Sequence, residues 1–183
     1  MRHIITGQIL LIVCCIFYMI WWYRGFKPNV EADRLGSING ILLLITAVLA
    51  VAGILFSLMP TPETAGTKYG QMYIIIGGIA AYIILMMVTK YAFNRIVTSE
   101  LFLIVGWTIL ELSLLNRLDG SNLLSGTGLM VVYVSVVLAF IISMILYVAY
   151  YRMEDNAAFY SAMVPLVTEA ASMGMLLVML LKQ

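Results

Sequence analysis

The sequence predicts an all-α membrane protein, a bundle of six transmembrane helices. Of its 183 residues, 63% are hydrophobic and only 10% are charged, and the apolar residues fall into six long blocks. Each block approaches the roughly 20 residues that a helix needs to cross the ~30 Å hydrocarbon layer. Backbone groups in lipid must be hydrogen-bonded within their own segment, which favours helices. Runs such as Ile41-Leu42-Leu43-Leu44-Ile45 lack the polar–apolar alternation of a barrel strand.

The six blocks use almost the whole 20.4 kDa chain, so one integral membrane domain covering residues 1–183 is expected. The first block is a span rather than a cleaved signal peptide, because it has no small-x-small cleavage pattern and ends in Trp21-Trp22-Tyr23-Arg24. The fourth block is the least certain to insert, since it holds Glu100 and Glu111. The predicted spans are residues 4–23, 37–59, 70–89, 98–116, 128–151 and 157–181.

The basic residues of the loops favour one orientation in the membrane. The loops after the first, third and fifth spans hold six of them, and the opposite side holds four. Because cytoplasmic loops are enriched in Lys and Arg, both termini are expected outside, in a multi-pass plasma-membrane protein. The six are Arg24, Lys27, Arg34, Lys90, Arg95 and Arg152, and the four are Arg2, Lys68, Arg117 and Lys182.

The spans begin at similar spacing in the two halves of the chain, which leaves two interpretations open. The first three and the last three spans could be inverted three-helix repeats, as in many transporters. Evenly spaced helices without any duplication would give the same pattern, and residue identity between the halves is slight.

Glu169 is the most informative single residue, because it falls at the midpoint of the sixth span. A carboxylate at that depth costs several kcal/mol unless it is paired, neutralised or wetted. Pro165 removes the hydrogen bond to the Ser161 carbonyl and should kink the span, while Thr168 and Ser172 are small enough for close helix approach. Glu169 therefore either contacts a solute or water path, or is a protonated acid that hydrogen-bonds helices together.

Other polar and small residues inside the spans each have two interpretations. Glu111 lies toward the outer end of the fourth span, where it either pairs with Arg117 or reaches water, or lines the same path as Glu169 if the two spans touch. Asn39 is expected to cap the second span. Four further residues either serve helix packing or widen and line a path: Gly77, Gly78, Tyr82 and Trp107.

Much familiar chemistry has no counterpart in the sequence. His3 is the single histidine, and Cys14 and Cys15 are adjacent and point about 100° apart on a helix, so no metal site or other cofactor is expected. No Walker loop, G-x-S-x-G or H-E-x-x-H motif occurs. A net charge of +1 leaves no basic surface for nucleic acid. The sequence therefore does not favour an enzyme.

Several features together resemble the bacterial urea/amide channel family. They are the six-span layout, Asn39 at the start of the second span, Pro60-Thr61 at its end, and Glu169 within Val164-Pro165-Leu166-Val167-Thr168-Glu169. The resemblance implies a six-helix channel with outside termini and an acid in its last helix. The external histidines of the acid-gated members are missing, as are most pore-lining tryptophans apart from Trp107. Acid gating is therefore not carried over.

The leading hypothesis is a small channel or transporter for a small neutral or weakly ionised solute, or for protons. Glu169 would be the polar contact at the midplane, and a homo-oligomer is expected because the bundle is small. A second hypothesis is a non-catalytic subunit or assembly factor of a larger membrane complex. It includes the substrate-binding subunits of vitamin transporters, which match in span count alone. A third is a membrane enzyme that acts on lipid.

Overall fold

The computed structural model describes residues 1–28, 36–60, 69–94, 99–124 and 126–182, and it is all-α in these ranges. Six helical segments are long and apolar enough to cross a membrane, which confirms the predicted six-helix bundle. The elements are α1 (Arg2–Phe26), α2 (Ser37–Leu58), α3 (Gln71–Phe93), α4 (Ser99–Gly120), α5 (Gly126–Ala149), the short 3-10 helix η2 (Tyr150–Arg152), α6 (Asp155–Ser161) and α7 (Val164–Leu181).

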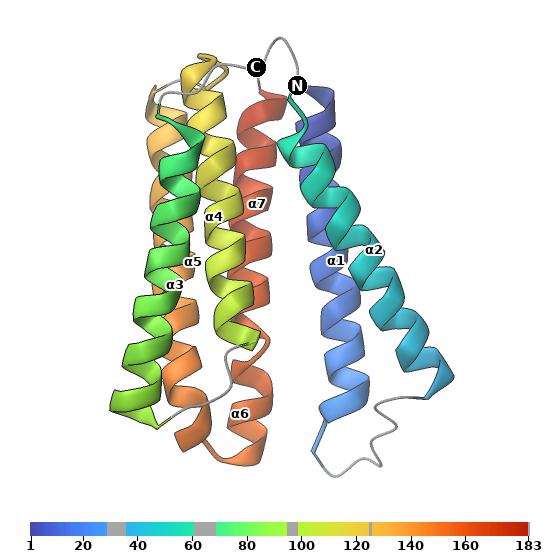
Figure 1. The fold of residues 1–183 in the computed structure, drawn as a ribbon. Coiled ribbons are helices and arrows are strands. Elements are labelled where there is room, and N and C mark those ends of the chain that lie inside the picture. Colours follow the sequence, from blue (N-terminus) through green and yellow to red (C-terminus); the bar gives the residue numbers. More distant parts are fainter. Residues whose placement is uncertain (29–35, 61–68, 95–98, 125, 183) are drawn as a thin grey trace.

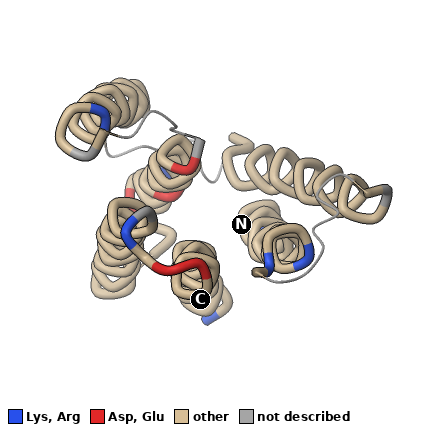
Figure 2. The backbone as a smooth tube through the Cα atoms, turned by 90° about the horizontal axis from the view of Figure 1, so that it is seen from below, with Lys and Arg blue, Asp and Glu red and all other residues tan. Residues whose placement is uncertain are grey.

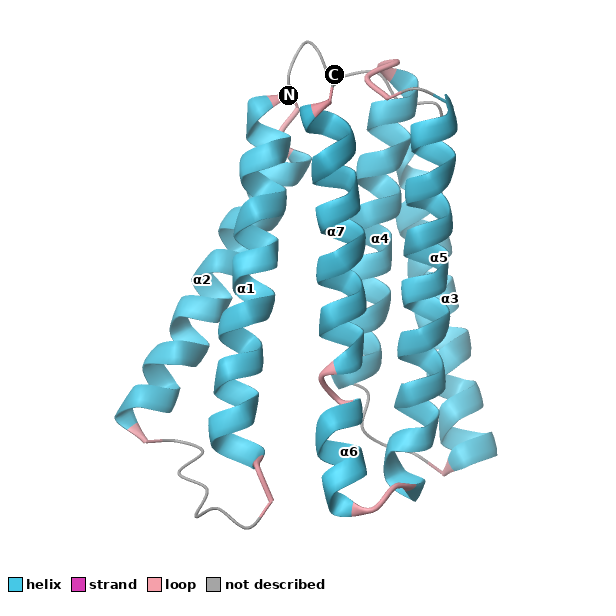
Figure 3. Ribbon diagram, turned by 180° about the vertical axis from the view of Figure 1, so that it is seen from behind, coloured by secondary structure: helices cyan, strands magenta, loops and turns pink. Residues whose placement is uncertain are grey.

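The helices form two unequal groups (Figure 1). In the larger group, α4 packs between α3 and α5, and α5 also packs against α7. In the smaller group, α1 and α2 form a closely packed pair that joins the larger group mainly through α1 and α7. Both termini lie at one end of the bundle, and α6 lies at the other (Figures 1 and 3). We call these the terminal end and the loop end.

The main apolar core lies toward the terminal end, where α1, α4, α5 and α7 meet. Its fully buried side chains include Ile4, Leu115, Val136 and Leu176. Away from this core the α1–α2 pair diverges from the other helices, and Figure 2, viewed from the loop end, shows it standing apart from them. A second buried cluster, formed by Leu101, Ile104, Val105 and Tyr147, packs α4 against α5 in the loop-end half, so it is the α1–α2 pair alone that separates from the bundle there.

The least apolar of the six spans, α4, is also the most buried. It contacts α2, α3 and α5, and its central position explains how it can carry Glu111 and Asn116 on buried faces. The doubtful fourth span is thus a transmembrane-length helix that sits inside the bundle. Neighbouring helices supply the polar partners that lipid cannot.

The α1–α2 pair packs closely through glycine. A Cβ atom at Gly7 would overlap the backbone nitrogen and the hydroxyl of Ser57, and one at Gly53 would lie 2.7 Å from Leu11 Cγ. Small residues let two backbones approach in this way. The spacing of Gly53 and Ser57, four residues apart on one helix face, is the sequence signal for this contact.

The two halves of the chain pack differently. In the second half, α4, α5 and α7 pack in series, whereas in the first half only α1 and α2 pack extensively on each other among the described residues. Helix α3 packs instead on α4, which belongs to the other half. The packing therefore gives no support to a pair of equivalent three-helix repeats.

The sixth crossing is broken, as Pro165 predicted. Helix α6 ends at Ser161 and α7 begins at Val164, with Pro165 in the first turn of α7. A proline there is tolerated because the first N–H groups of a helix have no intrahelical acceptor. The break lies beneath Glu169, which stands in the second turn of the new helix.

Candidate functional site

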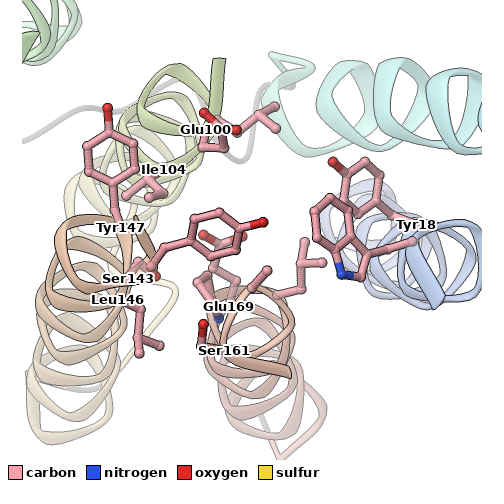
Figure 4. Close-up of a pocket in the computed structure, with 14 residues that line it drawn as sticks. Tyr18, Glu100, Ile104, Ser143, Leu146, Tyr147, Ser161 and Glu169 are labelled. Atoms are coloured by element: carbon pink, nitrogen blue, oxygen red, sulfur yellow. The ribbon is translucent and has the colours of Figure 1, made fainter. Parts of the chain in front are cut away.

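A cavity lies between α1, α4, α5 and the α6–α7 break, and Glu169 is part of its wall (Figure 4). Its volume is about 130 Å³, and it is partly enclosed. The wall is largely apolar, with Leu103, Ile104, Leu146 and Leu166 among its members. The polar and aromatic lining residues are Tyr18, Trp22, Glu100, Ser143, Tyr147, Tyr150, Ser161 and Glu169.

Glu169 points from α7 into this cavity (Figure 4) and is 8% exposed. It stands in the second turn of α7, just beyond the α6–α7 break. Because Glu100 lies in the first turn of α4 and Tyr147 lies at the loop end of α5, the cavity extends from the loop-end half of the bundle to Glu169.

The charged side chains of the cavity wall are all acidic. Glu169 lies deep and Glu100 lies in the first turn of α4, and no Lys or Arg is among the described lining residues. Ser143 adds a second feature, because its hydroxyl is fully buried and has no hydrogen-bond partner among the described residues. The wall thus contains the Glu169 carboxyl and a buried hydroxyl without a partner among the described residues.

One wall of the cavity is held in place by aromatic contacts near the loop end. Trp22 donates a hydrogen bond from Nε1 to the Phe159 carbonyl at 3.3 Å. Its ring stacks on Phe26, with 4.3 Å between centroids, and lies near parallel to Phe159 at 6.4 Å. These contacts tie α1 to α6 and fix the orientation of the indole.

Packed side chains close the bundle above Glu169. Met173, one turn further along α7, joins Leu11, Cys15 and Leu110 in a buried cluster, which we call the plug. Met173 is 1% exposed. The main core continues from the plug toward the terminal end. Among the described residues, these packed side chains therefore close the bundle between the cavity and the terminal end.

Glu111 lies in a different environment, on α4 beside the plug. It is 0% exposed, and Gln8 on α1 donates a hydrogen bond from Nε2 to its Oε1 at 3.3 Å. The same Gln8 nitrogen lies 3.4 Å from Ser57 Oγ on α2. This triad joins three helices. Glu111 Oε2 has no partner among the described residues, and the two glutamates are electrostatic neighbours.

The expected pairing of Glu111 with Arg117 is not what the structure has. Arg117 donates instead to the Leu58 carbonyl. Asn39 is also not a helix cap: Gly36 occupies the N-cap position of α2 without a side-chain hydrogen bond, and Asn39 Oδ1 accepts a bond from Arg24 Nε at 3.2 Å. Each of the two side chains thus bonds to a group on another helix, Arg117 to the Leu58 carbonyl of α2 and Asn39 to Arg24 of α1.

Four residues predicted to line or widen a path lie elsewhere. Gly77 borders open space on the exposed side of α3, and Gly78 packs against Ile109 of α4. Tyr82 makes an edge contact with Phe102 at 6.0 Å. Trp107 lies at the margin of the main core, and its buried Nε1 has no partner among the described residues. None of the four belongs to the cavity wall.

The two small neighbours of Glu169 serve helix structure. Thr168 Oγ1 donates to the Pro165 carbonyl at 2.9 Å. Ser172 Oγ lies 2.9 Å from Ser135 Oγ, a hydrogen bond that joins α7 to α5. Glu169 alone lines the cavity among the eight residues considered for a path or solute contact, the others being Glu111, Trp107, Tyr82, Gly77, Gly78, Thr168 and Ser172. Pro165 and Glu100, which the sequence marked for other reasons, also line it.

Most residues of the cavity wall were not predicted from the sequence. Trp22, Tyr147 and Tyr150 stand near span ends, where aromatic residues are typical of the membrane interface, and Ser143 carries no signal beyond being a hydroxyl within a span. Gln8 did carry a signal, since it is the one amide within residues 4–23. Buried amides in spans need partners, and an acid on another span is a natural one.

Within the described residues, no three His, Cys, Asp or Glu side chains gather as a metal site would need. Comparison with known proteins gave no match: neither a protein-family model, nor a curated protein, nor a solved structure resembles this chain significantly. The site's own geometry is therefore the basis for any functional conclusion.

Proposed function

We propose that this protein is a small membrane transporter for a small solute or for protons, with Glu169 as the central binding group. The observation that carries the proposal is the asymmetry around Glu169. A cavity extends to this residue from the loop end, whereas the plug closes the side toward the termini. An acid that is reached from one side at a time is what a carrier requires.

A carrier fits this asymmetry better than a permanently open channel. Transport would need the plug to open while the cavity closes, and the helix groups suggest how. The α1–α2 pair holds one wall, with Tyr18 and Trp22, and the larger group holds Glu169. Rocking of one group against the other would alternate access, as in many secondary transporters.

The basic residues of the loops support one orientation of the protein in the membrane. With the loop end in the cytoplasm, the termini would be outside and the cavity would face inward, in the plasma membrane. Helices α2 and α3 expose most of their apolar side chains in the described ranges. In a bilayer these faces would contact lipid or, in a homo-oligomer, a second copy of the chain.

The two other hypotheses have less support from the geometry. A subunit of a larger complex would use the exposed faces of α2 and α3 for docking, but it gives no role to a cavity beside Glu169. A lipid enzyme would need a second catalytic group near Glu169. Glu100, in the first turn of α4, is the other acid of the described wall, and the remaining polar lining groups are hydroxyls and the Trp22 indole.

The test is a flux assay with the purified protein in liposomes. Interior pH is followed with an enclosed pH-sensitive dye under an imposed pH gradient, and solute entry is followed by light scattering with urea and with glycerol. We expect at least one flux to exceed that of protein-free liposomes, and Glu169→Gln to remove the excess.

The matched control is Glu154→Gln, which makes the same chemical change at an exposed acid outside the cavity. It should leave the flux unchanged. If none of these fluxes exceeds the protein-free background, or if Glu169→Gln transports as fast as Glu154→Gln, the proposed function is wrong. Both variants are first shown to be monodisperse and helical, so that a folding defect is recognised.

A further inference from the structure

We infer that the cavity beside Glu169 binds a small organic cation, of about the size of one aromatic ring carrying an ammonium group. The inference deepens the proposed function and rests on it for the idea that the bound solute is carried. Binding itself is a separate property of the site, and it can be measured without transport. Three features of the cavity point to this class of ligand: its size, its charge and its wall.

The size of the cavity limits the ligand. Its volume is about 130 Å³, and an apolar cavity of roughly 150 Å³ in another protein holds one benzene molecule. Because the cavity is only partly enclosed, part of a ligand can extend beyond it. A single ring or a compact alkyl group of similar volume therefore fits, whereas a polycyclic compound or a lipid chain pair does not.

The charge of the cavity selects the sign of the ligand. Glu169 at the inner end and Glu100 near the loop end are the charged groups of the described wall. Acidic groups along an apolar-walled cleft raise the local concentration of cations and disfavour anions. An ionised carboxyl at the depth of Glu169 is costly unless something neutralises it, and a bound organic cation would do so.

The wall suits an organic cation better than a metal ion. Four aromatic residues line the cavity, namely Tyr18, Trp22, Tyr147 and Tyr150. Aromatic rings attract ammonium groups and gain most when water is excluded. A hydrated inorganic cation would need several oxygen ligands at short distance, and most residues of the cavity wall are apolar or aromatic.

Two side chains of the wall are relevant to binding. The Trp22 indole is fixed by its bond to Phe159 and its stacking on Phe26, so little side-chain freedom is lost on binding. The buried Ser143 hydroxyl has no partner among the described residues. It can accept a hydrogen bond from a primary ammonium, which links this orphan group to the same ligand class.

The experiment compares two compounds of nearly identical shape. Benzyltrimethylammonium carries a permanent positive charge, and neopentylbenzene replaces its nitrogen with carbon. Isothermal titration of the detergent-solubilised full chain should detect saturable binding of the cation. Neopentylbenzene should bind at least about thirtyfold more weakly, the loss typical of removing one partner of a buried charge pair. Equal binding of the two compounds would overturn the inference.

Variants place the binding at Glu169. Glu169→Gln should weaken binding of the cation by at least about thirtyfold, while Glu154→Gln should leave it unchanged. Glu169→Asp keeps the charge on a shorter stem and should retain measurable binding. If Glu169→Gln does not fold, the two compounds tested on the unaltered chain still decide the question. Absence of saturable cation binding to the unaltered chain rejects the inference.

The inference and the proposed function can fail separately. Cation binding without any flux in liposomes would reject the transporter and leave the binding site in place. Flux of protons, urea or glycerol that depends on Glu169, together with no binding of benzyltrimethylammonium, would retain the transporter and reject the organic cation. Inhibition of that flux by the cation, and not by neopentylbenzene, would support both.

Discussion

Two glutamates lie near each other inside this bundle, and their surroundings differ. Glu111 is fully buried and receives a hydrogen bond from Gln8, which also lies within reach of Ser57. Glu169 is 8% exposed and borders a cavity whose described wall contains no basic residue. The plug lies beside both. One acid has a protein partner on a neighbouring helix, and the other faces a space that a ligand can enter.

The difference shows why the burial of an acid is not sufficient to identify a functional site. Both residues would be costly to place in lipid, and sequence position alone left a shared path open as one of two interpretations of Glu111. For Glu111, the free-energy cost of burial is offset by the hydrogen bond from Gln8, which belongs to a contact between three helices. Its first role is therefore structural. The Glu169 carboxyl faces a cavity, so the free-energy cost of burying it can be offset by a ligand that binds reversibly.

The largest expected effect separates the two acids by flux. Glu169→Gln should remove Glu169-dependent transport, whereas Glu111→Gln should retain most of it, because an amide oxygen can still accept the Gln8 hydrogen bond. Parallel flux assays in liposomes measure both. An equal loss of flux in the two variants would mean that Glu111 shares the path, and the distinction drawn between them would be wrong.

A smaller effect is expected at the contact that brings Ser57 to Gln8. Gly7→Val inserts a side chain where even a Cβ overlaps Ser57, and overpacking of this kind costs about 1–3 kcal/mol. Thermal unfolding in detergent should show the loss. As a control, Gly77→Ala adds a methyl group at a position with no neighbour within 4 Å, and its stability should stay within about 0.5 kcal/mol of the parent.

The free energy of unfolding should also reveal the contribution of the hydrogen bond between Gln8 and Glu111. Glu111→Leu leaves the buried Gln8 amide without its carboxyl acceptor, which typically costs about 1–3 kcal/mol. Adding Gln8→Leu removes the stranded amide, and the double variant should recover part of the loss. A double-mutant cycle with a coupling energy near zero would show that Gln8 and Glu111 do not act together.

The smallest expected effect lies far from both acids, at the terminal end. Asn116 accepts a bond from the Tyr69 amide and donates to the Tyr69 carbonyl, each at 2.9 Å, and so fixes the entry to α3. Asn116→Ala should cost about 1 kcal/mol and speed hydrogen exchange at Tyr69 without changing flux. Exchange measured by mass spectrometry checks this, and a loss of flux would tie α3 to the transport path.

The fold could be predicted from the sequence because the constraint of the bilayer is simple. Long apolar blocks must be helices, and Pro165 must interrupt one. The lateral arrangement could not, since lipid-facing and buried positions are both apolar and no span shows a clear polar stripe. That is why Gly77, which borders open space, was given the same weight as Gly78, which packs on Ile109.

The site was predictable only at its centre. Glu169 was evident because an acid at mid-span is rare, but its neighbours on the cavity wall come from α1, α4 and α5, and their meeting depends on helix packing. Aromatic residues near span ends are readily interpreted as interfacial, and this interpretation leaves a role in lining a cavity unrecognised. Trp22 fits both, since it stands near the end of α1 and also lines the cavity.

Carbodiimide labelling of the unaltered protein tests the contrast between the two acids most directly. A carboxylic acid adds to dicyclohexylcarbodiimide, and the adduct rearranges to a stable N-acylurea without loss of atoms, so peptide mass spectrometry locates the modified residue. We predict that Glu169 is modified, that benzyltrimethylammonium protects it, and that Glu111 stays unmodified over the same time. Modification of Glu111 at a rate equal to that of Glu169, or no modification of Glu169, would contradict the account.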